Sequence, residues 1–311
     1  MTSPQPSQDA DAQAHTQAST APMTLTVAHC FDEIDRDPAH RARTAYIVVD
    51  VIRATTTLAV MFEHGARRVL VARDVDAARA VRATQPHAIL AGEVNAVAPP
   101  DFDHGNSPQE WSAVDVADRE ILFSTSNGAH ALHAALGGGP VFAGSLRNAR
   151  AVCAAALAAV RQLATPEQGG IVTVVCSGLG ARPADDDSLC AGWLIQTLRD
   201  EARRDHVGAE LGPGAQRALD LLAAQRAAFS QGEGQGADIA PRVWLAAAMR
   251  GTPAAQAVLA AGLGADLAWC ANVDASTVVP MIAGEDVSRK LVIVERAPER
   301  LVGLPIGEEI R

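Results

Sequence analysis

Residues 45–51 read Ala-Tyr-Ile-Val-Val-Asp-Val, and residues 56–64 read Thr-Thr-Leu-Ala-Val-Met-Phe-Glu-His. The first stretch is a nearly continuous run of apolar residues, which is typical of a strand buried on both faces of a sheet. The second stretch is largely apolar and contains no glycine or proline, which favours a helix soon after that strand. A strand followed by a helix is the step on which we base the predicted fold class.

The same step recurs along the chain. A predicted strand at 68–71 precedes a helix at 74–84, and helices starting near Gly128, Leu146 and Ser188 follow three of the later strands. These later strands are expected at 88–91, 121–124, 140–143 and 171–176. The alternation predicts an α/β fold, a three-layer α/β/α arrangement with a largely parallel or mixed sheet.

We expect one domain over residues 22–311, with a conceivable division into two lobes near residue 169. Residues 1–21 are rich in Gln, Ser, Asp, Thr and Pro, so they offer little to bury and a disordered tail is expected. Residues 212–262 are predicted to be mostly helical around a flexible Gly/Gln patch at 231–236. A return to β character is predicted at 290–295.

The composition restricts the class of ligand. The chain has 311 residues and a net charge of −10, with 48% hydrophobic but only 4% aromatic residues. The acidic charge argues against a nucleic-acid partner, because duplex binding relies on basic patches that neutralise phosphates. If the ligand is a small anion, an acidic chain needs a metal ion and a few well-placed arginines to hold it.

The cysteines form neither a disulfide framework nor a zinc site. They are odd in number and lack any CxxC or CxxH pair: Cys30, Cys153, Cys176, Cys190 and Cys270. Each is expected to be a small buried hydrophobe, and a reducing cytoplasm is the expected compartment. No apolar run reaches the roughly 18 residues of a bilayer span. The N-terminus also lacks the features of a signal peptide, so no membrane partner is expected.

Polar residues follow the predicted strands, where ligands gather in parallel sheets. Asp50 lies at the end of the first strand, where a carboxylate can take a metal ion. Arg53 can grip a phosphate oxygen with its planar guanidinium. Thr55, Thr56 and Thr57 could form an anion cradle with the free N–H groups of a helix start. Ordinary capping of that helix by Thr55 or Thr56 is the alternative.

Other strand-end loops carry further candidates. Glu93 is an acid just past the strand at 88–91, and Ser107 before Pro108 has the pattern of a helix N-cap with Glu110 at its third position. The remaining candidates are Asn106, Asn127, Ser145, Arg147, Asn148, Arg182, Asp186 and Asp187. The aspartates at the helix start are favourable to the helix dipole and could be no more than that. They are also hard oxygen ligands of the kind that Mg²⁺ takes.

The order of these motifs is more specific than any one of them. DVIRATTT at 50–57, GE at 92–93, FDHGNSPQE at 102–110, SNG at 126–128, GSLRN at 144–148, an acidic helix start and DLAWCANVD at 266–274 resemble the 2-phosphosulfolactate phosphatase family. The resemblance runs from about Tyr46 to Pro280. It implies a Mg²⁺-dependent phosphatase of the three-layer fold that forms a homodimer. It also implies hydrolysis of 2-phospho-3-sulfolactate to sulfolactate and phosphate, a step associated with coenzyme M biosynthesis.

Under this resemblance the candidates receive roles. We hypothesise that Asp50, Glu93 and Asp187 hold Mg²⁺ with Asp186 in support, and that the metal activates an attacking water. Catalytic roles fall to Asp50, Arg53 and Asn127. The substrate-binding set is Thr55, Thr56, Thr57, Asn106, Ser107, Ser145 and Asn148, with Arg147 or Arg182 against the carboxylate or sulfonate.

Three motifs depart from the family pattern. GERGG is replaced by Gly-Glu-Val-Asn-Ala at 92–96, TNGT by Ser-Asn-Gly-Ala at 126–129, and a Glu-Asp pair by Asp186 and Asp187. These changes keep the proposed metal carboxylates but remove groups that could hold the substrate. Phosphatase chemistry is therefore better supported than the exact substrate.

Three other functions remain as alternatives. A haloacid-dehalogenase-type phosphatase needs a second aspartate two residues after the first, where this chain has Ile52. A Rossmann-type oxidoreductase would rest on Gly178 and Gly180, but the third glycine is missing and nearby aspartates would repel a pyrophosphate. The alternative of a different class is a non-catalytic anion-binding scaffold of the same fold.

Overall fold

The computed structural model describes residues 21–165, 167–180, 182–231 and 239–302. The disordered tail predicted at 1–21 lies outside the described residues except for Ala21. Most of the Gly/Gln patch at 231–236 lies outside them too.

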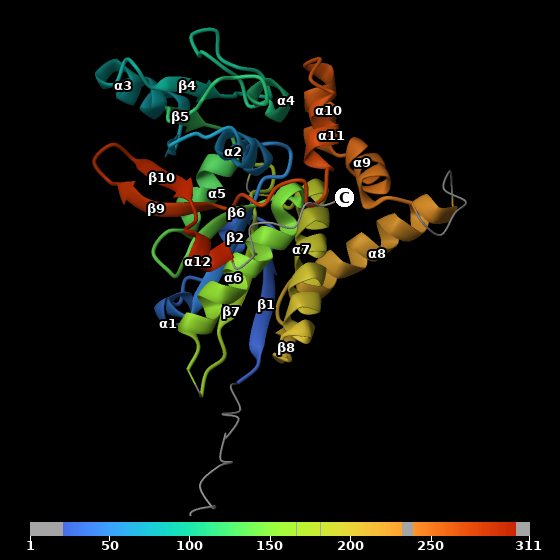
Figure 1. The fold of residues 1–311 in the computed structure, drawn as a ribbon. Coiled ribbons are helices and arrows are strands. Elements are labelled where there is room, and N and C mark those ends of the chain that lie inside the picture. The colour runs from blue at the N-terminus through green and yellow to red at the C-terminus, as the bar shows by residue number, and fades with distance from the viewer. Residues whose placement is uncertain (1–20, 166, 181, 232–238, 303–311) are drawn as a thin grey trace, which may run out of the picture.

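The core of the molecule is a ten-stranded sheet with the strand order β4-β5-β3-β10-β9-β6-β2-β7-β1-β8. The strands are β1 (Met23–Ala28), β2 (Thr44–Val49), β3 (Arg68–Ala72), β4 (Ile89–Gly92), β5 (Glu120–Ser124), β6 (Val141–Gly144), β7 (Ile171–Cys176), β8 (Ala209–Leu211), β9 (Pro280–Asp286) and β10 (Leu291–Arg296). Figure 1 shows β1, β2 and β7 running side by side through the centre of the molecule.

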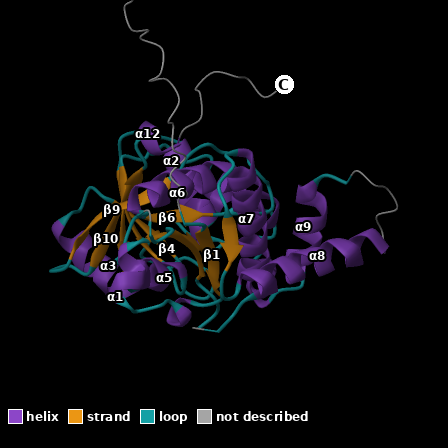
Figure 2. Ribbon diagram, turned by 90° about the horizontal axis from the view of Figure 1, so that it is seen from below, coloured by secondary structure: helices purple, strands orange, loops and turns teal. Residues whose placement is uncertain are grey.

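Helices connect and cover these strands. They are α1 (Pro38–Ala42), α2 (Ala54–Glu63), α3 (Val75–Thr84), α4 (Pro108–Trp111), α5 (Gly128–Ala135), α6 (Ala149–Leu163), α7 (Asp185–Arg204), α8 (Ala215–Gln231), α9 (Pro241–Arg250), α10 (Pro253–Ala260), α11 (Asp266–Cys270) and α12 (Glu299–Val302), with 3-10 turns η1 (Phe31–Glu33) and η2 (Leu146–Asn148). Seen from below, the strands lie between helices on both sides (Figure 2). The prediction of an α/β fold is confirmed.

The sheet contains two groups of parallel strands. One group is β4, β5 and β3, and the other is β6, β2, β7, β1 and β8. The antiparallel pair β9 and β10 joins them, and three antiparallel contacts in a row make the two groups run in opposite directions. The sheet is therefore mixed, as the prediction allowed.

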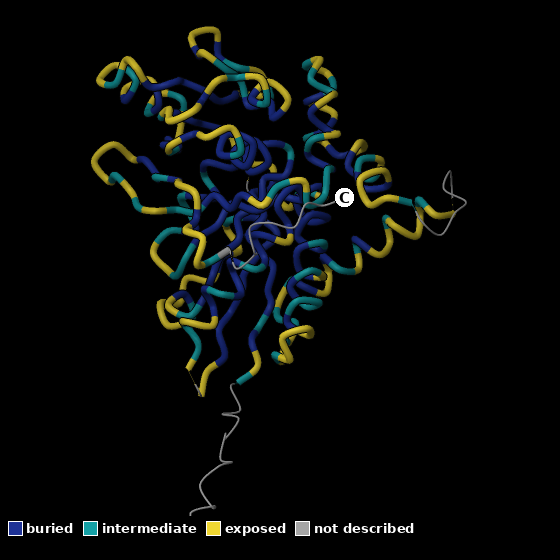
Figure 3. Tube along the Cα trace, in the orientation of Figure 1, coloured by how far each residue is buried: buried dark blue, intermediate teal, exposed yellow. Residues whose placement is uncertain are grey.

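Strand β2 separates the two helical layers. Ile47 belongs to the apolar cluster formed with α6 and α7, whereas Val48 belongs to the cluster formed with α2 and α5. Successive side chains of a strand point to opposite faces of the sheet, so a strand that is apolar at every position is buried on both sides. Figure 3 shows the central strands as the deeply buried part of the molecule, with exposed residues on its outer helices and turns.

The predicted boundaries needed small corrections. Strand β2 ends at Val49, so Asp50 and Val51 lie in the loop, and α2 begins at Ala54 rather than at Thr56. Neither Thr55 nor Thr56 caps α2, because Arg53 is the N-cap residue. Strand β7 matches the predicted 171–176 and lies between β1 and β2, so strands from both sides of residue 169 share one sheet.

The five cysteines are free and buried, in agreement with the prediction that each is a core residue. Burial raises the pKa of the Cys153, Cys176 and Cys190 thiols well above the ordinary value, which keeps them protonated. In the part of the chain that the structure describes, no helix combines the length and apolar character needed to cross a bilayer.

The central position of β2 leads to a stability prediction. Replacing Ile47, which is fully buried, with Ala should lower the free energy of unfolding by about 2–5 kcal/mol, because the deletion leaves a cavity between the sheet and α6. The matched control is Val287→Ala at a position that is 74% exposed, where a change within about 0.5 kcal/mol is expected. Urea unfolding monitored by circular dichroism measures both, and equal losses would contradict the predicted layering.

Candidate active site

The loop after β2 is built around the side chain of Asp50. Its Oδ1 accepts a hydrogen bond from the Ala54 N–H at 3.2 Å, which fixes the carboxylate over the first turn of α2. The backbone carbonyl of Asp50 accepts from the Thr55 hydroxyl at 2.9 Å, and the Asp50 N–H donates to that same hydroxyl. The aspartate is therefore held in place before any ligand arrives.

The three threonines stabilise this loop from within the protein. All three side chains are fully buried. Their hydroxyls donate to the backbone carbonyls of Asp50, Val51 and Asn106, respectively. These hydroxyl donors are therefore used by the backbone, and the predicted role of Thr55, Thr56 and Thr57 in a phosphate cradle stays a prediction.

The start of α7 meets the Asp50 loop from the other side. Asp187 Oδ1 accepts from the Val51 N–H at 2.9 Å, and its Oδ2 accepts from the Ser177 hydroxyl at 2.8 Å and from the Gly178 N–H at 3.0 Å. These bonds connect the loops after β2 and β7. The neighbouring Asp186 is also buried, but its Oδ1 has no hydrogen-bond partner.

The start of α5 completes the site and requires a glycine. A Cβ atom at Gly128 would lie 2.7 Å from Asp50 Oδ2 and 2.7 Å from the Ala54 Cβ, so no larger residue fits without displacing the loop. Asn127, the N-cap residue of α5, accepts a hydrogen bond from the Gly180 N–H at 3.1 Å through Oδ1. Because Asn127 follows β5 and Gly180 follows β7, this hydrogen bond joins loops that belong to the two oppositely directed strand groups.

The three aspartates create a strongly acidic, buried environment. Loss of hydration raises the pKa of Asp50, Asp186 and Asp187 to about 7 each, and mutual repulsion adds to the effect. Desolvation and a nearby like charge both disfavour the ionised carboxylate. A group of acids shifted to neutral pH in this way is typical of functional sites, although structural networks can also produce it.

These carboxylates open into a cavity of about 160 Å³. Its lining residues are Asp50, Ile52, Asn127, Ser177, Gly178, Leu179, Pro183, Ala184, Asp185, Asp186, Asp187, Pro253 and Ala254. None of these lining residues is a lysine or an arginine. An anionic substrate would therefore need a cation here, in addition to the dipoles of the helices that begin at the cavity.

The donor set fits a Mg²⁺ ion in part. Mg²⁺ is usually bound by one or two carboxylates together with water and substrate phosphate oxygens. Asp50 and the unpartnered Oδ1 of Asp186 meet that requirement, since both are hard oxygen donors at the cavity. In the described residues, no group of three or more His, Cys, Asp or Glu side chains is arranged to hold a metal ion.

Glu93 lies just outside this arrangement. Its Oε1 accepts from the Ser126 N–H at 2.7 Å and its Oε2 from the Ala96 N–H at 2.8 Å, so it connects the loops after β4 and β5. It does not line the cavity, but its charge contributes to the raised pKa of Asp50. Its assignment as a metal ligand stays a prediction.

The predicted arginines occupy three different places. Arg53 is 2% exposed and pairs with Asp266, with 2.7 Å between Nη1 and Oδ2. Arg147 forms two hydrogen bonds of 2.7 Å with Glu63 and lies over the Trp269 ring, away from the Asp50 cavity. Arg147 does not line this cavity, and its role as a substrate ligand stays a prediction.

The third arginine, Arg182, has an exposed side chain and does not itself line the cavity. Its backbone forms two hydrogen bonds with Leu179, which lines the cavity together with the adjacent Pro183. A role in binding the substrate stays a prediction for this residue.

Four other predicted residues have structural hydrogen bonds. Ser107 caps α4, as the alternative proposed, and its hydroxyl also donates to Asp266 Oδ1 at 2.6 Å. Ser145 and Asn148 form a capping box at η2 and are fully buried. The Asn106 carbonyl accepts from Thr57, and its side-chain Oδ1 is buried without a partner. None of these four lines the Asp50 cavity.

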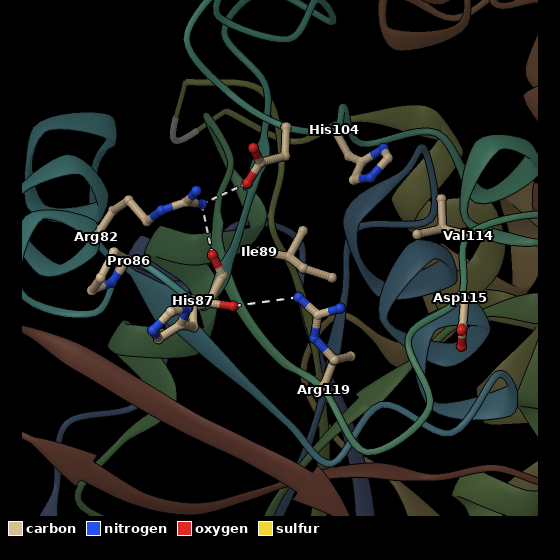
Figure 4. Close-up of a pocket in the computed structure, with 10 residues that line it drawn as sticks. Arg82, Pro86, His87, Ile89, His104, Val114, Asp115 and Arg119 are labelled. Carbon is tan, nitrogen blue, oxygen red and sulfur yellow. Dashed lines mark hydrogen bonds and ion pairs between the residues drawn. The ribbon is translucent and has the colours of Figure 1, made fainter.

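A larger cavity, of about 690 Å³, lies beside β4 at the edge of the sheet (Figure 4). Two arginines line it, but Arg82 is already paired with Asp103 and bonded to the Ala88 carbonyl. Arg119 donates to the His87 carbonyl at 3.4 Å. No predicted site residue lines this cavity, so the smaller one remains the candidate active site.

Comparison with known proteins identifies the family. A family model described as 2-phosphosulpholactate phosphatase matches residues 31–285. The chain belongs to the 2-phosphosulfolactate phosphatase family. Membership places it among the phosphoric monoester hydrolases.

Three relatives within this phosphatase family are each named "Probable 2-phosphosulfolactate phosphatase". The protein of Deinococcus radiodurans is 34% identical over 243 residues, which is 78% of this chain and 89% of the relative. That of Thermus thermophilus is 37% identical over 247 residues, which is 76% of this chain and 87% of the relative. That of Symbiobacterium thermophilum is 31% identical over 237 residues, covering 76% and 89%.

Several residues of the phosphatase site had escaped the sequence analysis. Ser177 directly precedes Gly178 but was not named as a candidate, and Pro253 and Ala254 carry no chemical signal. Asp266 was not singled out, although it begins the DLAWCANVD motif and its acidic side chain could have been considered as a partner for Arg53. Only the tertiary structure brings these four residues to the loop of Asp50.

The raised pKa values predict a pH dependence of stability for the metal-free phosphatase. Each folded pKa of about 7 exceeds the ordinary value of 3.8, so the native state binds protons more tightly. The contribution of these groups to stability is therefore lost as the pH rises from about 4 through about 7. Asp186→Asn removes one of these ionisable groups and so removes its share of the loss. The change in the free energy of unfolding on this substitution should therefore be more favourable at pH 8 than at pH 5 by at least about 1 kcal/mol.

Urea unfolding at the two pH values in EDTA measures this difference. The matched control is Asp274→Asn, because Asp274 caps a backbone N–H at Arg150 and does not line the cavity. This control should keep the wild-type pH profile. An effect of Asp186→Asn that is the same at pH 5 and pH 8 would contradict the assignment of the raised pKa.

Proposed function

We propose that the chain is a Mg²⁺-dependent phosphatase that hydrolyses 2-phospho-3-sulfolactate, or a similar small phosphorylated hydroxy acid, to the free acid and phosphate. The observation that carries the proposal is the meeting of Asp50, Asp186 and Asp187 at one cavity in a chain of this family. The names of the two relatives from Deinococcus radiodurans and Thermus thermophilus support the choice of substrate.

The acidic residues of the site have different proposed roles. Asp50 and Asp186 would hold the ion, with Glu93 and Asp187 as the other predicted ligands. When bound, Mg²⁺ supplies charge neutralisation for the phosphate and lowers the pKa of a coordinated water. Asp187 already uses both oxygens to hold the loops after β2 and β7, so its main contribution is to orient Asp50 against α7.

The phosphate would lie where helices begin. Asn127 lines the cavity at the start of α5 and its side-chain amide N–H₂ can donate to a phosphate oxygen. Helices α5 and α7 both start at the cavity, and their dipoles favour an anion there. We propose that Arg182 contacts the carboxylate or sulfonate of the substrate.

A non-catalytic anion-binding scaffold is the second candidate. It is favoured by the lack, within the described residues, of three ligands arranged for a metal ion. A scaffold would bind an anion without releasing phosphate, and Mg²⁺ would not affect that binding.

The decisive experiment measures phosphate release from 2-phospho-3-sulfolactate, phospholactate and phosphoglycolate, with Mg²⁺ or EDTA. We expect Mg²⁺-dependent turnover, with Asp50→Asn lowering kcat/KM by at least about 10²-fold because one of the proposed ligands of the ion loses its charge. Asp274→Asn, an aspartate away from the cavity, should retain wild-type turnover. No release from any ester by folded protein would favour the scaffold.

Metal binding has an independent readout. Mg²⁺ at 100 times its Kd should stabilise the wild-type protein by about 2.7 kcal/mol, since it binds the native state only. Asp186→Asn should reduce this stabilisation, whereas Asp274→Asn should leave it unchanged. Thermal unfolding with and without Mg²⁺ measures the effect, and equal stabilisation of Asp186→Asn and wild type would argue against this ligand.

The assembly and compartment of the protein belong to the same proposal. We propose a homodimer in the cytoplasm that acts on a small anion and binds neither nucleic acid nor membrane. Its free, buried cysteines are compatible with a reducing compartment. Sedimentation equilibrium tests the dimer, and a monomeric mass at micromolar concentration would contradict it.

A further inference from the structure

Asp266 connects three segments that are far apart in the sequence. It is the first residue of α11 and only 1% exposed. Its Oδ2 accepts from Arg53 Nη1 at 2.7 Å, and its Oδ1 accepts from the Ser107 hydroxyl at 2.6 Å and from the Gln109 N–H at 3.4 Å. Both carboxylate oxygens are therefore used within the protein, which leaves this group no direct contact with a substrate.

Arg53 extends the connection to a fourth segment. Its second terminal nitrogen, Nη2, donates to the Ala96 carbonyl at 2.6 Å. Arg53 also lies three residues after Asp50 and is the N-cap residue of α2. The guanidinium thus joins the loop of Asp50 to the loop after β4 and to α11.

An apolar cluster lies next to this ion pair. Ile52 and Ala96 pack against Ala255, Val258 and Leu267 of α10 and α11. Small movements of α10 would therefore be transmitted to the residue before Arg53, because packed side chains leave little room to adjust independently.

The same segments form the wall of the cavity. Ile52 lines it from the Asp50 loop, and Pro253 and Ala254 line it from the start of α10. The Arg53–Asp266 pair therefore connects the loop that carries Ile52 to α11, and α11 packs against α10 on the other side of the cavity.

We propose that Asp266 is a positioning residue of the phosphatase reaction, which holds α10 and the loop of Asp50 in register through Arg53. Arg53 acts through this same contact rather than by gripping the phosphate. The inference rests on the proposed function for its kinetic part only, because the connection between α11 and the loop can be measured without substrate.

The test is a double-mutant cycle of Arg53→Gln, Asp266→Asn and the variant with both changes. Each single variant should lower kcat/KM by about 10²-fold, which is the cost of a misplaced reacting group. The double variant should lose no more than either single variant, since residues that act as one unit are not additive. Asp274→Asn, in the same motif but bonded to the Arg150 N–H, is the matched control and should retain wild-type kcat/KM.

Other kinetic outcomes would overturn the proposal. If Arg53 binds the phosphate directly, Arg53→Gln should lose much more than Asp266→Asn. If the pair serves only stability, kcat/KM of the folded Asp266→Asn fraction should stay within about twofold of wild type, which is close to the resolution of such a comparison. The double variant keeps the test valid if a single variant fails to fold. It removes both charges, so neither is left buried without its partner.

Hydrogen exchange supplies the readout that does not need turnover. Asp266→Asn should increase amide exchange several-fold in peptides covering 93–97 and 253–260. The first segment is held by Arg53, which loses its partner, and the second packs against α11, which loses its ion pair to Arg53. Asp274→Asn should leave both unchanged. If the wild-type protein releases no phosphate from any ester, the proposed function fails. Amide exchange in Asp266→Asn that equals that of the wild type would separately overturn the positioning role.

Discussion

Three carboxylates approach one another where β2 ends and α7 begins, and their mutual repulsion is the constraint around which the rest of the site is organised. Like charges in a buried place are costly unless protons, a cation or hydrogen-bond donors compensate them. The chain compensates Asp187 with three donors and Asp50 with the first turn of α2, but leaves Asp186 Oδ1 without a partner. That difference between the three carboxylates is the basis of the cation site that we propose.

The sheet and its helices provide the rigidity that holds this charge cluster together. Two groups of parallel strands run in opposite directions, and the hydrogen bond from the Gly180 N–H to Asn127 joins a loop of one group to a loop of the other. Gly128 allows α5 to begin against Asp50, where a side chain would collide with the carboxylate. The repulsion among the three buried carboxylates is thus opposed by the hydrogen bonds and close packing of the loops around them.

Sequence reasoning was most successful where local pattern and burial agree. The run at 171–176 became β7 because a continuous apolar strand can be buried only on both faces of a sheet. It was less successful for β9, whose segment contains Pro280 and Gly284 and pairs with β10 in an antiparallel hairpin. Which strands pair depends on contacts between segments that are distant in the sequence. The reversal of direction between the two strand groups could therefore not be predicted from the sequence of each strand.

By itself, the sequence determined the α/β alternation, the family and the position of acids and hydroxyls at strand ends, because these depend on local pattern and on the order of motifs. The tertiary structure decided which of those groups face the cavity. Arg53 pairs with Asp266, 213 residues later, and the threonine hydroxyls bond to backbone carbonyls. A buried donor must find an acceptor wherever the fold supplies one, and no local spacing reveals a partner that is distant in the chain.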